Sequence, residues 1–123
     1  MQKTKKLSKS KIKNLLLLFK YVISQKSGNK LACLRYLDDN SIDSISESIY
    51  NLLFNEKLNL VLSSLQKRKL KKIIKPNIQN FEIISKKKIP IRKRRSKIIQ
   101  QGSGIATILL TLLPMLSSLL IKK

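Results

Sequence analysis

The stretch that decides the fold is residues 41–55, which read SIDSISESIYNLLFN. Its apolar side chains recur at spacings of three and four residues: Ile42, Ile45, Ile49, Leu52 and Leu53. Such spacing places them on one face of an amphipathic helix, which we expect to end near Asn55. The preceding turn, residues 38–41, offers N-caps. Ser44 followed by Glu47 fits a capping box, and Ser41 is the other candidate for the N-cap.

An earlier stripe supplies a packing partner for this helix. Apolar residues again recur every three or four positions, and they predict a helix over Ser10–Gln25: Ile12, Leu15, Leu16, Phe19, Val22 and Ile23. We expect Ile45, Ile49 and Leu52 to face this first helix. The run 27–29 should break it, and Leu31, Leu34 and Leu37 should continue as a short second helix.

No alternating strand pattern and no internal repeat is visible, so the predicted fold class is all-α. We expect a disordered basic arm over residues 1–11 and a small helical domain over residues 12–62. Within that domain, residues 59–62 are mostly apolar, and their secondary structure is ambiguous. A core of this size is close to the lower limit for independent stability, so a partner or self-association would help.

Charge is distributed very unevenly along the 123 residues. The net charge is +21, but residues 38–56 hold five acids and no cation, whereas residues 57–98 hold fifteen cations and one acid, Glu82. A field of this sign concentrates polyanions, which means nucleic acid or an anionic membrane surface. The acidic segment thus lies between two basic arms, since residues 1–37 carry ten cations and no acid.

Residues 63–101 are predicted to form basic helices that bind nucleic acid. Ser63 and Ser64 can cap a helix that runs through Lys75, Pro76 should end or kink it, and Pro90 fits the start of a helix over 91–101. The residues expected to contact phosphate are Lys67, Arg68, Lys69, Lys71, Lys72, Lys75, Lys86, Lys87, Lys88, Arg92, Lys93, Arg94, Arg95 and Lys97.

Aromatic residues are sparse around these cations, since Phe81 is the only one after Phe54. Base stacking on single strands is therefore poorly supported, and contact with the phosphate backbone without sequence preference is the economical interpretation. The alternative is that both basic segments are ordinary solvated faces. A nuclear-localisation role for residues 86–97 is compatible with DNA binding.

The C-terminal third joins this basic run to an apolar segment. Residues 102–104 form a predicted hinge, and residues 105–121 run seventeen positions without a charge within a predicted tail over 105–123. A helix of that length reaches about 25 Å, slightly short of a bilayer core of about 30 Å. Membrane contact, protein docking and a core helix of the same domain all remain open. The predicted membrane or docking residues are Leu109, Leu112, Leu113, Leu116 and Leu120.

Enzymatic chemistry has little support in this composition. The chain has no His and a single cysteine, Cys33, so catalytic triads, disulfides within the chain and multi-thiolate metal sites have no residues to build them. Cys33 lies among apolar residues, where a small buried side chain is the simplest interpretation. We therefore expect no enzyme activity, no metal and no cofactor.

The order of basic run, Gly-containing break and Leu/Ile/Pro-rich tail resembles the precursor of adenovirus core peptide mu. Residues 92–104, RKRRSKIIQQGSG, together with Leu112, Leu113 and Pro114, are also similar to small basic proteins of Polinton-like and adintovirus-like elements. Residues 62–72 resemble the second basic helix of those proteins. The resemblance covers roughly residue 42 to the end and rests on short, compositional motifs.

This resemblance implies a viral core protein that condenses packaged double-stranded DNA in the virion and host nucleus, with a tail that docks capsid or membrane. It also implies cleavage by a maturation protease between Ser103 and Gly104, although Gln100 stands where that protease prefers an apolar residue. The alternative for this stretch is an ordinary flexible linker. Alternative functions are a membrane-active or membrane-anchored minor virion protein and a small RNA-binding, ribosome-associated protein.

Overall fold

The computed structural model describes residues 8–121, excluding the side chains at 27, 28, 31, 59, 103 and 116–121. Within that range the chain contains helices and no strand, which confirms the all-α prediction. In chain order these are α1 Lys9–Ser24, α2 Ser27–Arg35, α3 Asp39–Phe54, α4 Glu56–Val61, α5 Ser64–Ile74, the 3₁₀ helix η1 Lys75–Asn77, α6 Ile78–Ser85, α7 Ile91–Gln101 and α8 Ser103–Ile121.

Two helix starts show how local sequence sets these bounds. The N-cap of α3 is Asp38, whose carboxylate accepts from the backbone N–H of Ser41 at 2.8 Å. Asp38 belongs to the turn that was expected to offer the N-cap, whereas Ser41 is not the cap and the capping box at Ser44 is wrong, because Ser44 lies buried inside the helix. At α5 the prediction is confirmed, because Ser63 and Gln66 form a reciprocal capping box with distances of 3.1 and 2.9 Å.

Three connections can be compared with the sequence prediction. The break before α2 lies at residues 25–26, and Gly28 is inside the first helical turn, where backbone N–H groups lack intrahelical partners in any case. The ambiguous residues 59–62 belong mostly to α4, which Asn55 caps. At Pro76 the α-helix has given way to η1, as expected, but the chain continues directly into α6, a helix that the sequence analysis did not predict.

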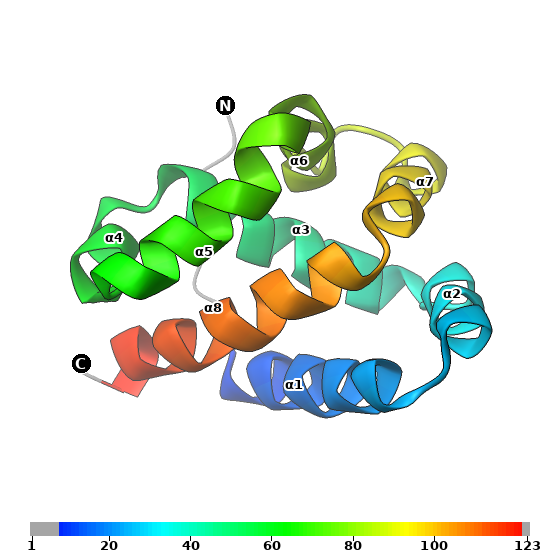
Figure 1. Cartoon of the computed structure of the whole chain (residues 1–123), viewed down its shortest axis with the longest axis horizontal. Coiled ribbons are helices and arrows are strands. Elements are labelled where there is room, and N and C mark those ends of the chain that lie inside the picture. Colours follow the sequence, from blue (N-terminus) through cyan, green and yellow to red (C-terminus); the bar gives the residue numbers. More distant parts are fainter. Residues whose placement is uncertain (1–7, 122–123) are drawn as a thin grey trace.

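Helix α8 is the central element of the core (Figure 1). It packs along α1 more extensively than any other pair of helices in the described chain, and it also contacts α3, α4, α5 and α7. Its buried residues are at most 1% exposed: Ile105, Ala106, Ile108, Leu109, Leu112 and Leu113. Thr107, Thr111 and Pro114 lie on one stripe of α8 and remain half-buried or exposed, whereas its apolar sides pack on the other helices of the same chain.

The structure therefore differs from the predicted separate tail. Leu109, Leu112 and Leu113 contribute to the core of this domain, and the predicted hinge is a short turn at Gly102 between α7 and α8. The side chains of Leu116 and Leu120 lie outside the described residues, as do residues 122–123. Of the predicted disordered arm, residues 9–11 are helical and residues 1–7 lie outside the described range.

The predicted contact between α1 and α3 exists but is not the main one. Ile45 and Ile49 are fully buried, whereas Leu52 is only half-buried. Because α8 fills the space beside α1, the apolar face of α1 packs chiefly on α8 and only secondarily on α3.

Candidate nucleic-acid interface

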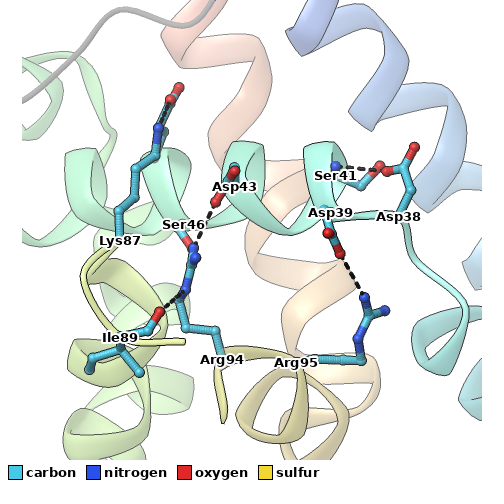
Figure 2. Close-up of polar contacts among 10 residues, drawn as sticks. Asp38, Asp39, Ser41, Asp43, Ser46, Lys87, Ile89, Arg94 and Arg95 are labelled. Carbon is cyan, nitrogen blue, oxygen red and sulfur yellow. Dashed lines mark hydrogen bonds and ion pairs between the residues drawn. The ribbon is translucent and has the colours of Figure 1, made fainter. Parts of the chain in front are cut away.

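A row of acids on α3 determines what several of the predicted phosphate-binding cations do. Asp39, Asp43 and Glu47 are spaced four residues apart, so they lie on one stripe of the helix, beside the apolar stripe that holds Ile45. This acidic stripe faces α7 and the connection that precedes it (Figure 2).

Arg94 on α7 is the most deeply buried of these cations, at 3% exposure. Its Nη1 donates to Oδ1 of Asp43 at 3.0 Å and to Oγ of Ser46 at 2.7 Å, and its Nε donates to the carbonyl of Ile89 at 2.8 Å (Figure 2). The planar guanidinium is suited to such a site because it presents several donors in a fixed geometry. Arg94 therefore joins α7 to α3.

Two further cations bond to α3 and to the segment before it. Nη2 of Arg95 lies 3.4 Å from Oδ1 of Asp39, and its Nη1 donates to the backbone carbonyls of Arg35 and Leu37. Lys87 pairs with Glu47, whose side chain is only 7% exposed. We call Lys87, Arg94 and Arg95 the α3-bound cations.

The prediction that the α3-bound cations contact nucleic acid needs correction. Arg94 is too deeply buried to reach a phosphate, and its hydrogen bonds are internal. Lys87 and Arg95 remain partly exposed, but each already bonds to an acid or a carbonyl of its own chain. Their role in the structure is to neutralise the acidic stripe and to fix α7.

Helix α5 and the first residue of η1 present a different kind of cationic surface. Six predicted ligands lie here, all exposed: Lys67, Arg68, Lys69, Lys71, Lys72 and Lys75. The inner side of the helix is held by Leu70 and Ile74, which are buried. None of the six forms an ion pair with another described residue, and residues 57–81 contain no acid.

A second exposed group lies on the connection from α6 to α7 and on α7 itself. It comprises Lys86, Lys88, Arg92 and Lys93, with Lys97 half-buried. Figure 1 shows α6 between the upper end of α5 and α7, so the predicted site is divided between two surfaces.

Among the described residues, Asp38 at the N-cap of α3 has a lowered pKa. Hydrogen bonds from the side chain and then the backbone N–H of Ser41 lower the pKa of Asp38 below its ordinary value of 3.8, and the charge of Arg95 adds a smaller effect in the same direction. The ionised carboxylate is thus the form that caps the helix.

The predicted cleavage residues Ser103 and Gly104 lie in the first turn of α8. A protease that binds its substrate extended would have to unwind this turn, whose following residues are in the core.

Among the described residues, no single helix is long and apolar enough to cross a membrane; α7 and residues 104–115 would qualify only as a pair, bent by 100°. The described residues also contain no cluster of acids and thiol that could hold a metal.

Comparison of the chain with protein-family models, with curated proteins and with solved structures gave no match.

The division between internal and exposed cations had a signal in the sequence that the analysis missed. The acids of residues 39–47 recur every four positions, which is the spacing of a stripe that needs a cationic partner. The six cations of α5 and η1 have no such acidic counterpart nearby in the sequence, and these six stay exposed.

Proposed function

We propose that this protein binds double-stranded DNA through its phosphate backbone, without sequence preference. The carrying observation is the surface of α5 and η1, where six exposed cations occupy nine consecutive positions with no acid among them. Each cation that replaces a condensed counterion at a phosphate contributes favourably and in a salt-dependent way. The exposed cations around α7 form a second contact surface.

Backbone binding to a duplex is favoured because the two surfaces lack stacking groups. The exposed aromatic side chains are Tyr21, Tyr36 and Phe54, which belong to α1, to the end of α2 and to the end of α3. Neither α5 nor α7 contains an aromatic residue. Single-strand binding would ordinarily use aromatic platforms within the cationic groove.

The resemblance to viral basic core proteins extends this proposal to a packaged genome in a virion, formed in the host nucleus. In that role the exposed cations condense the DNA. Docking to capsid or membrane through residues 105–113 is not part of the proposal, because these residues are buried or half-buried in the core.

The test is the binding of two 30-base-pair duplexes of unrelated sequence, measured by fluorescence anisotropy from 50 to 200 mM salt. If six to ten phosphates are contacted, affinity should fall by about 10³–10⁵ over this range, equally for both duplexes. A flat salt response, a strong preference for one duplex, or tighter binding to the matching RNA duplex would contradict the proposal.

A matched pair of variants locates the contact. Arg68→Gln/Lys69→Gln/Lys72→Gln removes three cations from the side of α5 that points away from the core. Lys11→Gln/Lys13→Gln/Lys20→Gln removes the same charge from exposed positions of α1. Only the first variant should reduce the slope of log K against log salt, by about two to three for three lost contacts. Equal effects would show that net charge, and no defined surface, governs binding.

A further inference from the structure

An apolar groove lies beside the basic face of α5. Its volume is about 520 Å³, and its apolar walls come from α3, the end of α4, α5 and α6: Leu52, Leu53, Leu62, Leu70, Ile74 and Ile78. Several of these side chains are incompletely covered, and Ile78 is 40% exposed. Phosphate groups do not bind to apolar surface, so DNA binding does not account for these apolar walls, which we call the floor of the groove.

One edge of the groove is a regular row of cations. Lys67, Lys71 and Lys75, which we call the groove lysines, are four residues apart and line the groove. At about 1.5 Å per residue the row is about 12 Å long, with one ammonium group about every 6 Å. Arg68, Lys69 and Lys72, the outer cations, do not line it.

This combination specifies the chemistry of an occupant. The floor requires an apolar surface, and the row requires several anionic groups repeated along the length of the ligand. A fatty acid or a lysolipid carries its charge at one end, so it would leave two of the three groove lysines without a counterpart. An amphipathic helix with acids at i, i+4 and i+8 repeats its carboxylates about every 6 Å, beside a stripe of apolar side chains.

We propose that the groove binds an acidic amphipathic helix of a partner protein, with its apolar stripe on the floor and its acids along the groove lysines. A second copy of this chain does not provide such a helix from its described part. Its row of acids on α3 is already held by the α3-bound cations, and Glu56 and Glu82 are isolated acids on α4 and α6. The partner is therefore a different, acidic protein.

The experiment uses the full chain and a fluorescein-labelled 18-residue peptide that forms a helix with Leu on one stripe and Glu at i, i+4 and i+8 beside it. Affinity is measured by anisotropy. The variant Lys67→Gln/Lys71→Gln/Lys75→Gln should weaken binding at least tenfold. The matched control, with all three outer cations changed to Gln, loses the same charge from the same helix and should weaken it less than threefold.

Two altered peptides separate the contributions of the floor and the row. Replacing the three Glu by Gln, or the Leu stripe by Ser, should each weaken binding at least tenfold. On the protein side, Ile78→Ser should weaken binding of the original peptide and leave binding of the Leu-to-Ser peptide unchanged. Circular dichroism of every variant confirms that the helical fold is retained, since all substituted side chains are exposed.

Three results would overturn the proposal. Equal losses in the groove-lysine and outer-cation variants would mean unspecific attraction between opposite charges. Displacement of the peptide by oleate, with no discrimination among peptides, would assign the groove to a single-headed lipid. A concentration-dependent dimer that disappears in the groove-lysine variant would assign it to a second copy. Duplex binding is measured separately, so absence of DNA binding would not affect this test, and its failure would leave the DNA proposal standing.

Discussion

Nη1 of Arg94 lies 3.0 Å from Oδ1 of Asp43, although 51 positions separate the two residues. The Arg94 side chain is 3% exposed and the Asp43 side chain is 38% exposed, so the pair joins the interior of the protein to its surface. Arg94 also donates hydrogen bonds to Oγ of Ser46 and to the backbone carbonyl of Ile89. This cluster fixes the position of α7 against α3.

Replacement of Arg94 by Met should destabilise the protein by about 2–4 kcal/mol, because Ser46 and Ile89 lose their donor and Asp43 loses its counter-charge. Arg92→Met removes an exposed cation from the same helix and should change stability by less than about 0.5 kcal/mol. Urea denaturation followed by circular dichroism measures both values. Similar stability of the two variants would contradict the structural role of Arg94.

Composition identified the excess of positive charge, but it could not show which cations are internal. The local density of cations is highest in residues 86–97, where eight of twelve positions are cationic, and it favoured this segment as a phosphate-binding site. Burial depends on which helix packs beside which, and α7 packs beside the acidic stripe of α3. By contrast, the N-cap at Ser63 and the bounds of α7 are local features; a cap at Ser63 or Ser64 was expected, and the helix over 91–101 was predicted with its observed bounds.

The N-cap of α3 predicts a defined pH response. The pKa of Asp38 is lowered in the folded state, so this carboxylate stabilises the fold above its ordinary pKa of 3.8. That contribution is lost as pH falls through the lower folded value. Asp38→Asn keeps a capping side chain but does not titrate. The wild type should therefore be the more stable of the two at pH 6, and the difference should shrink between pH 4 and pH 2.

Thermal unfolding of both proteins at pH 6, 4, 3 and 2 measures this difference. The other acids titrate in both proteins, so the comparison isolates Asp38. A difference that stays constant down to pH 2 would show that ionisation of Asp38 does not contribute to the cap.

The role of α8 could not be derived from its own residues. An uncharged run of seventeen residues is compatible with a membrane segment, a docking peptide or a core helix, and only the surrounding elements discriminate among them. Here α1, α3, α4 and α5 each leave an apolar face that needs covering, and α8 covers them. The sequence analysis assigned the core to residues 12–62, close to the lower limit for independent stability, and expected a partner or self-association to help.

A chain that ends at Ser103 should consequently fail to fold. The truncation removes six fully buried side chains. Burial of each Ile or Leu among them contributes about 1.5–3 kcal/mol to stability, and the sum of these contributions is comparable to or larger than the usual stability of a small domain. We expect loss of cooperative thermal unfolding in circular dichroism. Leu109→Ala is the milder test and should cost about 2–5 kcal/mol, with Leu60→Ala at an 84% exposed position as the control. A folded truncation product that still binds DNA would restore the model of a separable tail.

Gly102, in the turn between α7 and α8, and Gly104, at the start of α8, should respond differently to substitution by Ala. Gly102 has φ +55° and ψ −129°, a conformation that residues with a side chain rarely adopt, and its N–H caps α7 by donating to the carbonyls of Ile98 and Ile99. Gly102→Ala should therefore destabilise the protein by about 1–3 kcal/mol, even though an added methyl group would meet no atom closer than 4.0 Å.

Gly104 is helical, and an added methyl group there would lie at ordinary contact distance, 3.4 Å from Cγ2 of Ile73. Because Ala is favoured over Gly within a helix by up to about 1 kcal/mol, Gly104→Ala should be neutral or slightly stabilising. Urea denaturation of both variants provides the comparison. If residues 102–104 were instead a flexible hinge, neither substitution would change stability, since an unstructured linker accepts Ala at both positions.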